Sequence, residues 1–239
     1  GRTDIRLKLP DDIVSSEYLT LEGKKISTSS NWAIWIKDIL LRYNADSIRY
    51  FLIANGPEKR DTDFTWREFI NSHNGELLGA YGNFVNRSLV FIQKFFEAEV
   101  PDANCNSAFL HSLASIYKDT GTLIEDTNFK EALERIFAFI RTANKYFDEE
   151  QPWLTVKNDI EKCKQTLNTC IQIIANLSVL LDPFLPFSSA KVRSMLKIEN
   201  TSWHPVKVPA GIKLNHVEIL FERLDKKVIS EEEERLKCN

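Results

Sequence analysis

The sequence predicts a mainly α-helical protein, an antiparallel helical bundle preceded by a small α/β region. One observation is the scarcity of helix breakers in the middle: Gly121 and Gly211 have no glycine between them, and Pro152 is the only proline between Pro101 and Pro183. A second is that apolar residues recur in that stretch in steps of three and four, as on one face of a helix. The first 60 residues differ, because they combine several breakers with runs of β-prone residues.

The N-terminal elements follow from these runs. The segments IVSSEYLTL and KKIST predict a short strand or hairpin. Two compact helices are expected after them, over about 31–42 and about 45–54. Asn44 is a suitable N-cap for the second helix, because its side chain can accept a hydrogen bond from the first helical turn.

The bundle helices are predicted from their periodicity. One helix is expected over about 75–97, a less regular one over about 107–125, and two more beginning at Asn128 and Asp159. A short helix is expected over 187–196, after Pro183 and Pro186. Antiparallel packing of these helices would form the bundle. The expected core residues are Leu77, Tyr81, Phe84, Val85, Leu89, Ile92 and Phe96; Phe129, Leu133, Ile136, Ile140, Ala143 and Phe147; and Ile160, Cys163, Leu167, Cys170, Ile174, Leu177 and Leu181.

The C-terminal part is less regular. Residues 200–221 are mixed and hold two prolines and a glycine. The run ISEEEERLK predicts a charged surface helix or a frayed tail, and a solvated face is the favoured interpretation.

Composition limits the classes of function. The chain has 239 residues, of which 43% are hydrophobic and 27% charged, so an ordinary globular protein of one or two domains is expected. The net charge of −3 disfavours a basic protein that coats nucleic acid, although specific binding through a few residues stays open. No apolar run approaches 18 residues and no apolar signal region is present, so we expect a soluble cytoplasmic protein without a membrane partner.

The cysteines do not predict a metal site. Cys105, Cys163, Cys170 and Cys238 are not spaced as CxxC, and zinc is therefore not expected. Four cysteines in so long a chain favour a reducing compartment. Cys163 and Cys170 lie in an apolar stripe, so both are interpreted as small core residues.

A self-contained enzyme is not supported by motifs. The sequence lacks GxGxxG, GxxxxGK[ST], GxSxG and HExxH, and its four histidines do not cluster. The chain begins at Gly1, from which we expect that it was processed or cut from a longer protein.

Three local features could bind a ligand. In LEGKKISTSSNW, residues 21–32, two lysines and several hydroxyl groups precede an expected helix start, an arrangement that suits a polyanion such as a triphosphate. From composition alone, a polar surface loop is the favoured interpretation of this segment.

The second feature is a pair of polar residues one helical turn apart. Asn83 and Arg87 lie at i and i+4, away from the main apolar stripe, and can together read a base edge. From the residues alone, a solvated helix face or a structural bond to a neighbouring loop is the favoured interpretation of this pair. The third feature is Trp153, which follows Pro152 at a helix corner, where it could pack beneath the turn or stack on an unpaired base.

These features occur together in a familiar order. The sequence resembles the C-terminal half of methionyl-tRNA synthetases, which are class I aminoacyl-tRNA synthetases. The similarity extends from about residue 10 to at least residue 200. The signature loop of that class, Lys-Met-Ser-Lys-Ser, resembles Lys25-Ile26-Ser27-Thr28-Ser29. The stretches NADSIRYFL, RDTDFTWREF, YGNFVNR and QPW are more specific to the methionine enzymes than this loop is.

The resemblance implies a function for each feature. The signature loop, with Lys24, would stabilise the phosphates of ATP while methionyl-adenylate forms; the parent enzyme would be an ATP-dependent methionine–tRNA ligase that also uses magnesium. Asn83 and Arg87 would read the wobble-end cytosine of the CAU anticodon of tRNA(Met), and Trp153 would stack on a splayed base. The expected regions are a signature-loop and stem-contact region over 1–58, an anticodon-binding bundle over 59–199, and a tail over 200–239 that packs back on either region.

The sequence departs from the family pattern in two ways. Thr28 stands where the signature loop has its second lysine, and threonine cannot place a full positive charge on the reacting phosphate. The N-terminal Rossmann domain and the zinc-binding insertion of the family have no counterpart in this chain. We therefore expect the chain to lack a complete catalytic site and to be inactive alone, with the N-terminal catalytic domain of the same protein as its partner.

Two other functions stay open at this point. One is a helical module for protein interaction or oligomerisation, in which Trp153 would be buried. The other is the anticodon-binding domain of a related class I synthetase.

Overall fold

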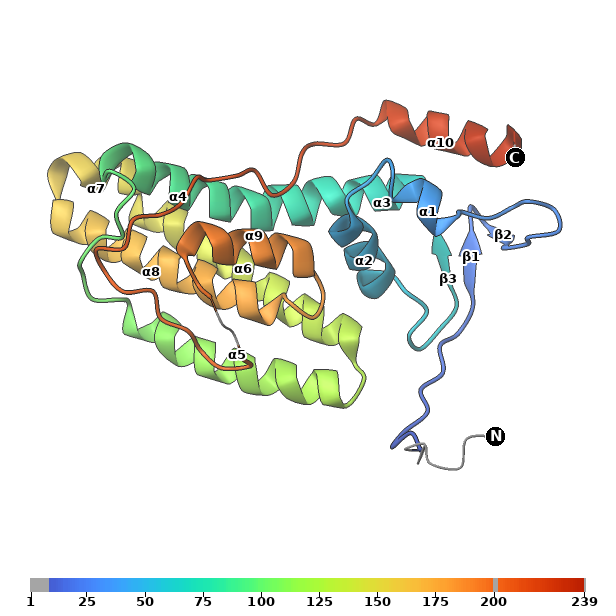
Figure 1. The fold of residues 1–239 in the computed structure, drawn as a ribbon, viewed down its shortest axis with the longest axis horizontal. Coiled ribbons are helices and arrows are strands. Elements are labelled where there is room, and N and C mark those ends of the chain that lie inside the picture. Colours follow the sequence, from blue (N-terminus) through green and yellow to red (C-terminus); the bar gives the residue numbers. More distant parts are fainter. Residues whose placement is uncertain (1–8, 200–201, 239) are drawn as a thin grey trace, which may run out of the picture.

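In the computed structural model, residues 9–199 and 202–238 are described, with only the backbone at Cys238. The first eight residues of the predicted N-terminal region and residues 200–201 and 239 lie outside the described residues. The described residues bury two hydrophobic cores, a small one near the N-terminus and a large one in the bundle. A long helix runs from one core to the other (Figure 1).

The small core surrounds a three-stranded sheet. Strand β1 (Leu19–Leu21) lies between β2 (Lys24–Lys25), which is antiparallel to it, and β3 (Thr62–Phe64), which is parallel. Because parallel strands cannot be joined by a tight turn, a crossover is required. Helices α1 (Ile36–Ile39) and α2 (Ala45–Ala54) lie in this crossover.

The predicted hairpin is present, but the third strand was not predicted. The predicted helix over about 31–42 is wrong, since α1 spans only four residues. Ser27 and Trp32 pair as an antiparallel bridge, and Trp35 is extended, so the chain turns helical only at residue 36. The predicted helix over 45–54 is confirmed, and Asn44 accepts a hydrogen bond from the Asp46 N–H at 2.8 Å.

Aromatic rings fill the small core. Their edge-to-face contacts have centroid separations of 5.0–5.8 Å, a favourable geometry for aromatic pairs. Leu236, from the far end of the chain, is buried in the same core. The rings belong to Tyr43, Phe51, Phe64, Trp66 and Phe69.

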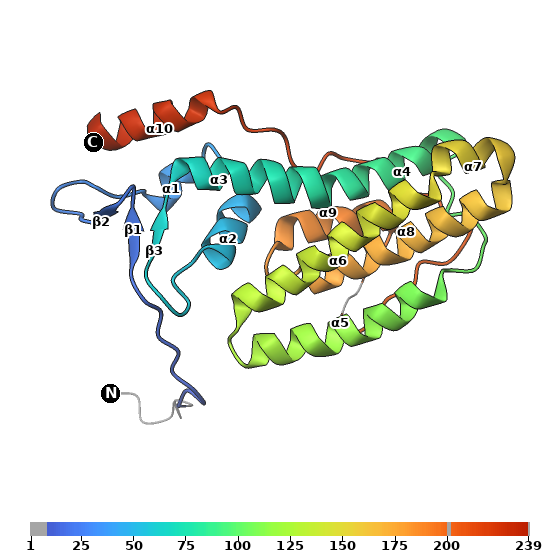
Figure 2. The ribbon, with the colours of Figure 1, turned by 180° about the vertical axis from the view of Figure 1, so that it is seen from behind.

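One continuous helix connects the two cores (Figure 2). It consists of α3 (Trp66–Ser72), a π-helical segment η1 (His73–Gly82) and α4 (Asn83–Phe95). The predicted start near residue 75 is wrong, because the helix begins nine residues earlier at Trp66. Thr65 caps it there by accepting a hydrogen bond from the Glu68 N–H at 3.2 Å. Thr65 and Glu68 have the spacing of a capping box, a signal that periodicity alone does not detect.

The large core lies in the predicted antiparallel bundle, and the predicted fold class is confirmed. Besides α4, the bundle contains α5 (Ser107–Glu125), α6 (Phe129–Glu150), the short α7 (Pro152–Asn158), α8 (Ile160–Leu180) and α9 (Pro186–Leu196), and α8 packs against all the others. Helix α8 is central, with every residue from Thr166 to Leu180 buried.

The predicted core stripes are buried almost throughout. Phe129 and Ile160, each the first residue of its helix, are 40% and 43% exposed, and Phe96 is half-buried. Cys163 and Cys170 are fully buried, which confirms their interpretation as core residues. Burial raises the pKa of the Cys170 thiol to about 12, so it stays protonated and unreactive.

Residues 202–226 form a C-terminal strap that runs back along the bundle to the small core (Figure 1). The strap ends in α10 (Lys227–Cys238), which packs against α3. The favoured interpretation of ISEEEERLK as a solvated face is wrong at two positions. Glu232 and Leu236 are only 3% and 5% exposed, because one face of α10 covers the small core.

Candidate functional site

The corner between α6 and α7 positions Trp153. Gln151 adopts a left-handed conformation with φ of 47°, which ends α6, and Pro152 opens α7 at its first position. Proline suits that position because its missing N–H would have no partner there. Trp153 follows at once and keeps 40% of its surface exposed, so its ring is available for stacking.

Arg87 reaches this corner from α4. Its guanidinium carbon lies 4.5 Å from the ring centroid of Phe147 and 6.0 Å from that of Trp153. Its Nη2 donates to the Asp148 carboxylate at 2.7 Å. The Phe147 ring is buried, whereas the Arg87 side chain is 32% exposed. The aromatic face and the carboxylate therefore hold the guanidinium in one orientation at the surface.

Asn83 lies one turn before Arg87 on α4, and its side chain is exposed. The structure thus brings Arg87 and Trp153 together, with Asn83 on the adjacent turn. Phe147 and Asp148 complete the arrangement but were not among the predicted site residues. We call Arg87, Phe147, Asp148 and Trp153 the corner cluster. A planar donor fork beside an exposed indole can bind and stack an unpaired base.

The predicted polyanion site lies on the β1–β2 hairpin. Glu22 and Gly23 have φ of 48° and 72°, the left-handed pair that a two-residue hairpin requires. The Gly23 N–H donates to the Asp63 carboxylate at 2.9 Å, and the Glu22 carboxylate accepts from the Trp66 N–H at 2.8 Å. These bonds tie the hairpin to β3 and α3.

Residues 24–29, the predicted signature loop, follow this turn. Ser27 and Trp32 exchange two backbone hydrogen bonds of 3.0 Å and 2.9 Å, which close a small loop between them. The Ser27 and Ser29 hydroxyls lie 3.1 Å apart, and the Ser30 N–H donates to Ser27 Oγ at 3.4 Å. Lys25, Ile26 and Thr28 are exposed. Hydroxyl groups and lysines are therefore presented to solvent together.

The two candidate sites lie at opposite ends of the molecule. The corner cluster is at the α7 end of the bundle, and the signature loop is beside β2 at the other end (Figure 1). The long helix of α3, η1 and α4 spans the distance between them.

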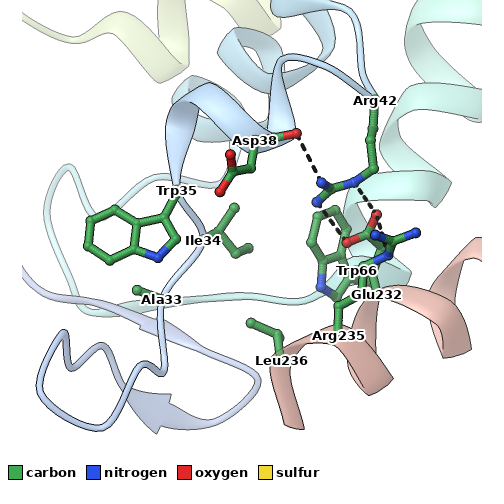
Figure 3. Close-up of a pocket in the computed structure, with 9 residues that line it drawn as sticks. All are labelled: Ala33, Ile34, Trp35, Asp38, Arg42, Trp66, Glu232, Arg235 and Leu236. Atoms are coloured by element: carbon green, nitrogen blue, oxygen red, sulfur yellow. Dashed lines mark hydrogen bonds and ion pairs between the residues drawn. The ribbon is translucent and has the colours of Figure 1, made fainter. Parts of the chain in front are cut away.

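A cavity of about 260 Å³ lies near the signature loop, between α1 and α10 (Figure 3). Its walls include Trp35, Asp38 and Trp66, but its main charges are paired. Glu232 accepts from Arg42 Nε at 2.7 Å, as Figure 3 marks, and from the Tyr43 hydroxyl at 3.0 Å. Burial and Glu232 raise the pKa of the Tyr43 phenol, so the hydroxyl remains a donor. These paired side chains of the cavity wall therefore connect the small core to α10.

Residues 9–199 and 202–238 contain no group of three or more His, Cys, Asp or Glu side chains placed to hold a metal ion. Within the same residues, no helix combines the length and the apolar character needed to cross a bilayer.

Comparison with known proteins identifies the family. Residues 100–239, more than half of the chain, match the model of the anticodon binding domain of methionyl tRNA ligase. The chain belongs to the methionyl-tRNA ligase family. Residues 2–89 match the model of class I tRNA synthetases (M). This range contains residues 24–29, the predicted signature loop. This membership decides against the anticodon domain of a different class I synthetase.

Relatives in this family are close in sequence. The chain is 55% identical over 225 residues to methionine–tRNA ligase 1 of Alkaliphilus oremlandii, and 54% identical over 228 residues to methionine–tRNA ligase of Bacillus cereus. These matches cover 94% and 95% of the chain but only 42% of each relative. The chain therefore spans about two-fifths of the length of these methionyl-tRNA ligases.

Solved structures of the family have the same fold. Methionyl-tRNA synthetase of Mycobacterium tuberculosis in its free state superposes with a TM-score of 0.81 at 22% identity, covering 92% of this chain and 45% of that one. The complex of that enzyme with methionyl-adenylate superposes with a TM-score of 0.83 at 23% identity, and the match covers 91% of this chain and 45% of that one.

Proposed function

We propose that this chain is the part of a methionine–tRNA ligase that binds the anticodon loop of tRNA(Met). The whole protein would attach methionine to tRNA(Met) with ATP and magnesium, in the cytoplasm. The observation that carries the proposal is the corner cluster, because a fixed guanidinium and an exposed indole lie side by side. Trp153 lies within residues 100–239, which match the family's anticodon-binding model, and Arg87 reaches it from α4, which precedes them in the sequence.

The wobble-end cytosine of a CAU anticodon fits the polar groups of α4. Cytosine presents an amino donor beside two acceptors on its pairing edge. Arg87 supplies only donors, and Asn83 supplies both donors and an acceptor, so the two side chains can match that edge. Trp153 would stack on a base splayed from the loop, which supports affinity but not base identity.

The second part of the proposal concerns ATP. Lys24 and Lys25 form β2, the Ser27 and Ser29 hydroxyls lie 3.1 Å apart in the loop that follows, and residues 24–29 would contact the phosphates of ATP during methionyl-adenylate formation. The partner needed for this step would be the catalytic domain of the same protein. The division into a signature-loop and stem-contact region over 1–58, an anticodon bundle over 59–199 and a tail from residue 200 belongs to the same proposal.

Fluorescence anisotropy with labelled anticodon stem-loop RNA tests the first part. A CAU loop is compared with a loop changed only at the cytosine. We expect wild-type protein to prefer CAU, and Arg87→Met and Asn83→Ala to lose the preference. Trp153→Ala should weaken binding of both loops by about 1–3 kcal/mol, the contribution of one stacked base.

Matched controls make the test specific. Trp35 is similarly exposed, at 45%, but lies at the other end of the molecule, and Arg141 is an exposed arginine paired with Glu76. Trp35→Ala and Arg141→Met should bind as wild type does. Equal affinity of the wild-type protein for both loops would contradict anticodon reading and favour the helical interaction module.

A further inference from the structure

The solvent-facing side of α4 continues beyond the residues proposed to read cytosine. The buried side of this helix consists of Phe84, Val85, Ser88, Leu89 and Ile92. Asn83 and Arg87 lie on the opposite side, and Val90 and Lys94 follow them after three and four residues, the spacing of neighbours on one helix face. Val90 is 42% exposed, although a solvent-facing helix position usually carries a polar residue. This face therefore begins with two polar residues and becomes partly apolar towards the end of the helix.

Two phenylalanines lie beside this face. Arg87, Phe91 and Phe95 are spaced four residues apart, so each side chain is turned by only about 40° around the helix axis from the one before. The ring centroids of Phe91 and Phe95 are 4.4 Å apart, with 34° between the ring planes. Phe91 is half-buried against the large core, whereas Phe95 is 43% exposed. The inner ring therefore supports the outer ring at the surface, on the same flank of α4 as Arg87.

Lys94 adds a positive charge to this surface. Its Nζ lies 5.2 Å from the centroid of the Phe95 ring, and it forms no ion pair with any carboxylate among the described residues. An exposed cation–π contact of this kind is weaker than the stacking of a base on an aromatic ring. A base can therefore take the place of the ammonium group on the ring, and the ammonium group can move to the phosphate beside that base.

Acidic residues mark the end of this surface. A cavity of about 520 Å³ beside Phe95 is lined by three of them, Glu97, Glu99 and Asp102. Lys164, which also lines the cavity, pairs with Glu161 at 2.7 Å. Carboxylates repel phosphates, so an RNA backbone would not continue into this cavity. Phe95 would therefore be the last contact for RNA on α4, about 12 Å along the helix from Arg87.

We propose that Phe95, supported by Phe91, stacks on a second unpaired base of the anticodon loop, and that Lys94 contacts the phosphate beside that base. The base is one of the two anticodon bases that follow the cytosine. The inference rests on the proposed binding of the anticodon loop at the corner cluster and extends that surface along α4. Continuity with Asn83 and Arg87 and an unpaired positive charge favour RNA over a protein segment as the occupant. Because every base has an aromatic face, this contact adds affinity without base identity.

Fluorescence anisotropy with the full-length protein and a CAU stem-loop tests the stacking contact. Phe95→Leu keeps apolar bulk but removes the ring, so it should weaken binding by about 5- to 100-fold. Phe95→Tyr keeps the ring and should stay within about twofold of wild type. Phe129→Leu is the matched control, because Phe129 is 40% exposed and lies at the far end of α6 from the corner cluster. It should bind as wild type does.

Removal of a base from the RNA shows whether the ring contacts that base. An abasic nucleotide is placed in turn at the adenine and at the uracil of the CAU loop. At one of these two positions, wild type and Phe95→Leu should bind the abasic loop with equal affinity, because the partner of the ring is absent. If Phe95→Leu remained weaker than wild type with both abasic loops, the ring would act indirectly and the assignment would be overturned.

The salt dependence of binding tests the phosphate contact. The slope of log affinity against log salt concentration should become shallower by about 0.7 in Lys94→Met, the share of one contact with single-stranded nucleic acid. Lys37→Met is the control, because Lys37 is an exposed lysine of α1 at the other end of the molecule (Figure 1). It should leave the slope unchanged. An unchanged slope in Lys94→Met would overturn the phosphate contact.

Failure of the anticodon proposal would give a different result. Wild type would then bind the CAU loop and the loop changed at the cytosine equally, and the second stacking site would be overturned with it. If wild type prefers CAU but Phe95→Leu binds as tightly as Phe95→Tyr, only the second stacking site is overturned. Phe95→Leu should keep the preference for CAU, because Asn83 and Arg87 are unchanged.

Discussion

Glu232 and Arg42 are 190 residues apart in sequence, yet their side chains form two hydrogen bonds of 2.7 Å and 3.0 Å. Glu232 is almost fully buried, so its carboxylate depends on this pairing and on the Tyr43 hydroxyl. The pair fastens α10 to the small core that carries the signature loop. The far end of the chain thereby contributes to the region near its beginning.

Arg42→Met should destabilise the fold by about 1–3 kcal/mol, because the buried Glu232 carboxylate loses its cation. The effect stays within this range because Arg42 is partly exposed, so solvent already screens the ion pair. Arg42→Met combined with Glu232→Leu should be more stable than Arg42→Met alone, since no unpaired charge remains. Urea unfolding measures both. Arg135→Met, which breaks exposed pairs of 3.3 Å and 3.4 Å, should change stability by no more than about 0.5 kcal/mol. A similar loss in both single variants would contradict a special role for Arg42.

Gln172→Leu should loosen the C-terminal strap. The Gln172 amide exchanges two hydrogen bonds with the Val208 backbone, at 2.8 Å and 2.9 Å, and both residues are buried. Leucine would leave a buried N–H and a buried C=O unpaired, which costs about 2–4 kcal/mol in urea unfolding. Gln165→Leu, at an exposed position of the same helix, is the control and should be nearly neutral. Equal effects of the two changes would show that the amide pairing is unimportant.

Gly121→Ala should displace Trp203. A Cβ atom at Gly121 would lie 2.9 Å from the Trp203 Nε1, which donates to the Tyr117 carbonyl at 3.1 Å. The indole must therefore move and lose this bond, which lowers stability by about 1 kcal/mol or more. Gly75→Ala meets nothing within 4 Å and should stabilise the helix by up to about 1 kcal/mol. Thermal unfolding distinguishes these signs, and a stabilising Gly121→Ala would refute the predicted clash.

His73 should make stability depend on pH. Its Nε2 donates to the Glu222 carbonyl at 2.7 Å, its Nδ1 lies 2.9 Å from the Ser47 hydroxyl, and burial lowers the pKa of the imidazole below its ordinary value of 6.5. Between the lowered pKa and 6.5 the unfolded chain binds more protons than the folded one, so stability is lost as pH falls through this window.

His73→Gln removes this titration but keeps a side chain that can donate to Glu222. Urea unfolding measures the free energy of unfolding of both proteins at about pH 7.5 and 5.5. Between these pH values wild type should lose more stability than His73→Gln, and the difference should be at most about 1.4 kcal/mol, the limit for one group over one pH unit below 6.5. An equal acid loss in both proteins would mean that His73 is not the responsible group.

Much of the bundle was predictable because its signals are local. The steps of three and four after Asn128 and Asp159 identify the buried faces of α6 and α8, and Asn44 caps α2 as expected. The predicted helix starts were wrong where two short-range signals in the sequence compete. The first turns of the helix expected from residue 31 do not form, because Ser27 and Trp32 pair as a β-bridge. The capping box at Thr65 starts the long helix before its apolar stripe becomes regular.

The candidate sites were likewise predictable only in part. Asn83, Arg87 and Trp153 could be proposed from spacing and resemblance, but spacing did not reveal that Arg87 rests on Phe147 and donates to Asp148, which is 61 residues away in sequence. The lysines of the hairpin could be proposed as well. That Lys24 lies over the Trp32 ring could not, because that depends on how the loop closes.

The sequence by itself determined the helical class, the main helices of the bundle and the residue types at both sites, since periodicity, caps and resemblance act over short segments. The tertiary structure decided which acidic residue of α10 is buried, which lysine stands on Trp32 and how Arg87 is oriented. Two of these three contacts join residues that are more than 60 positions apart. Such contacts depend on how whole helices pack, and no local pattern contains that information.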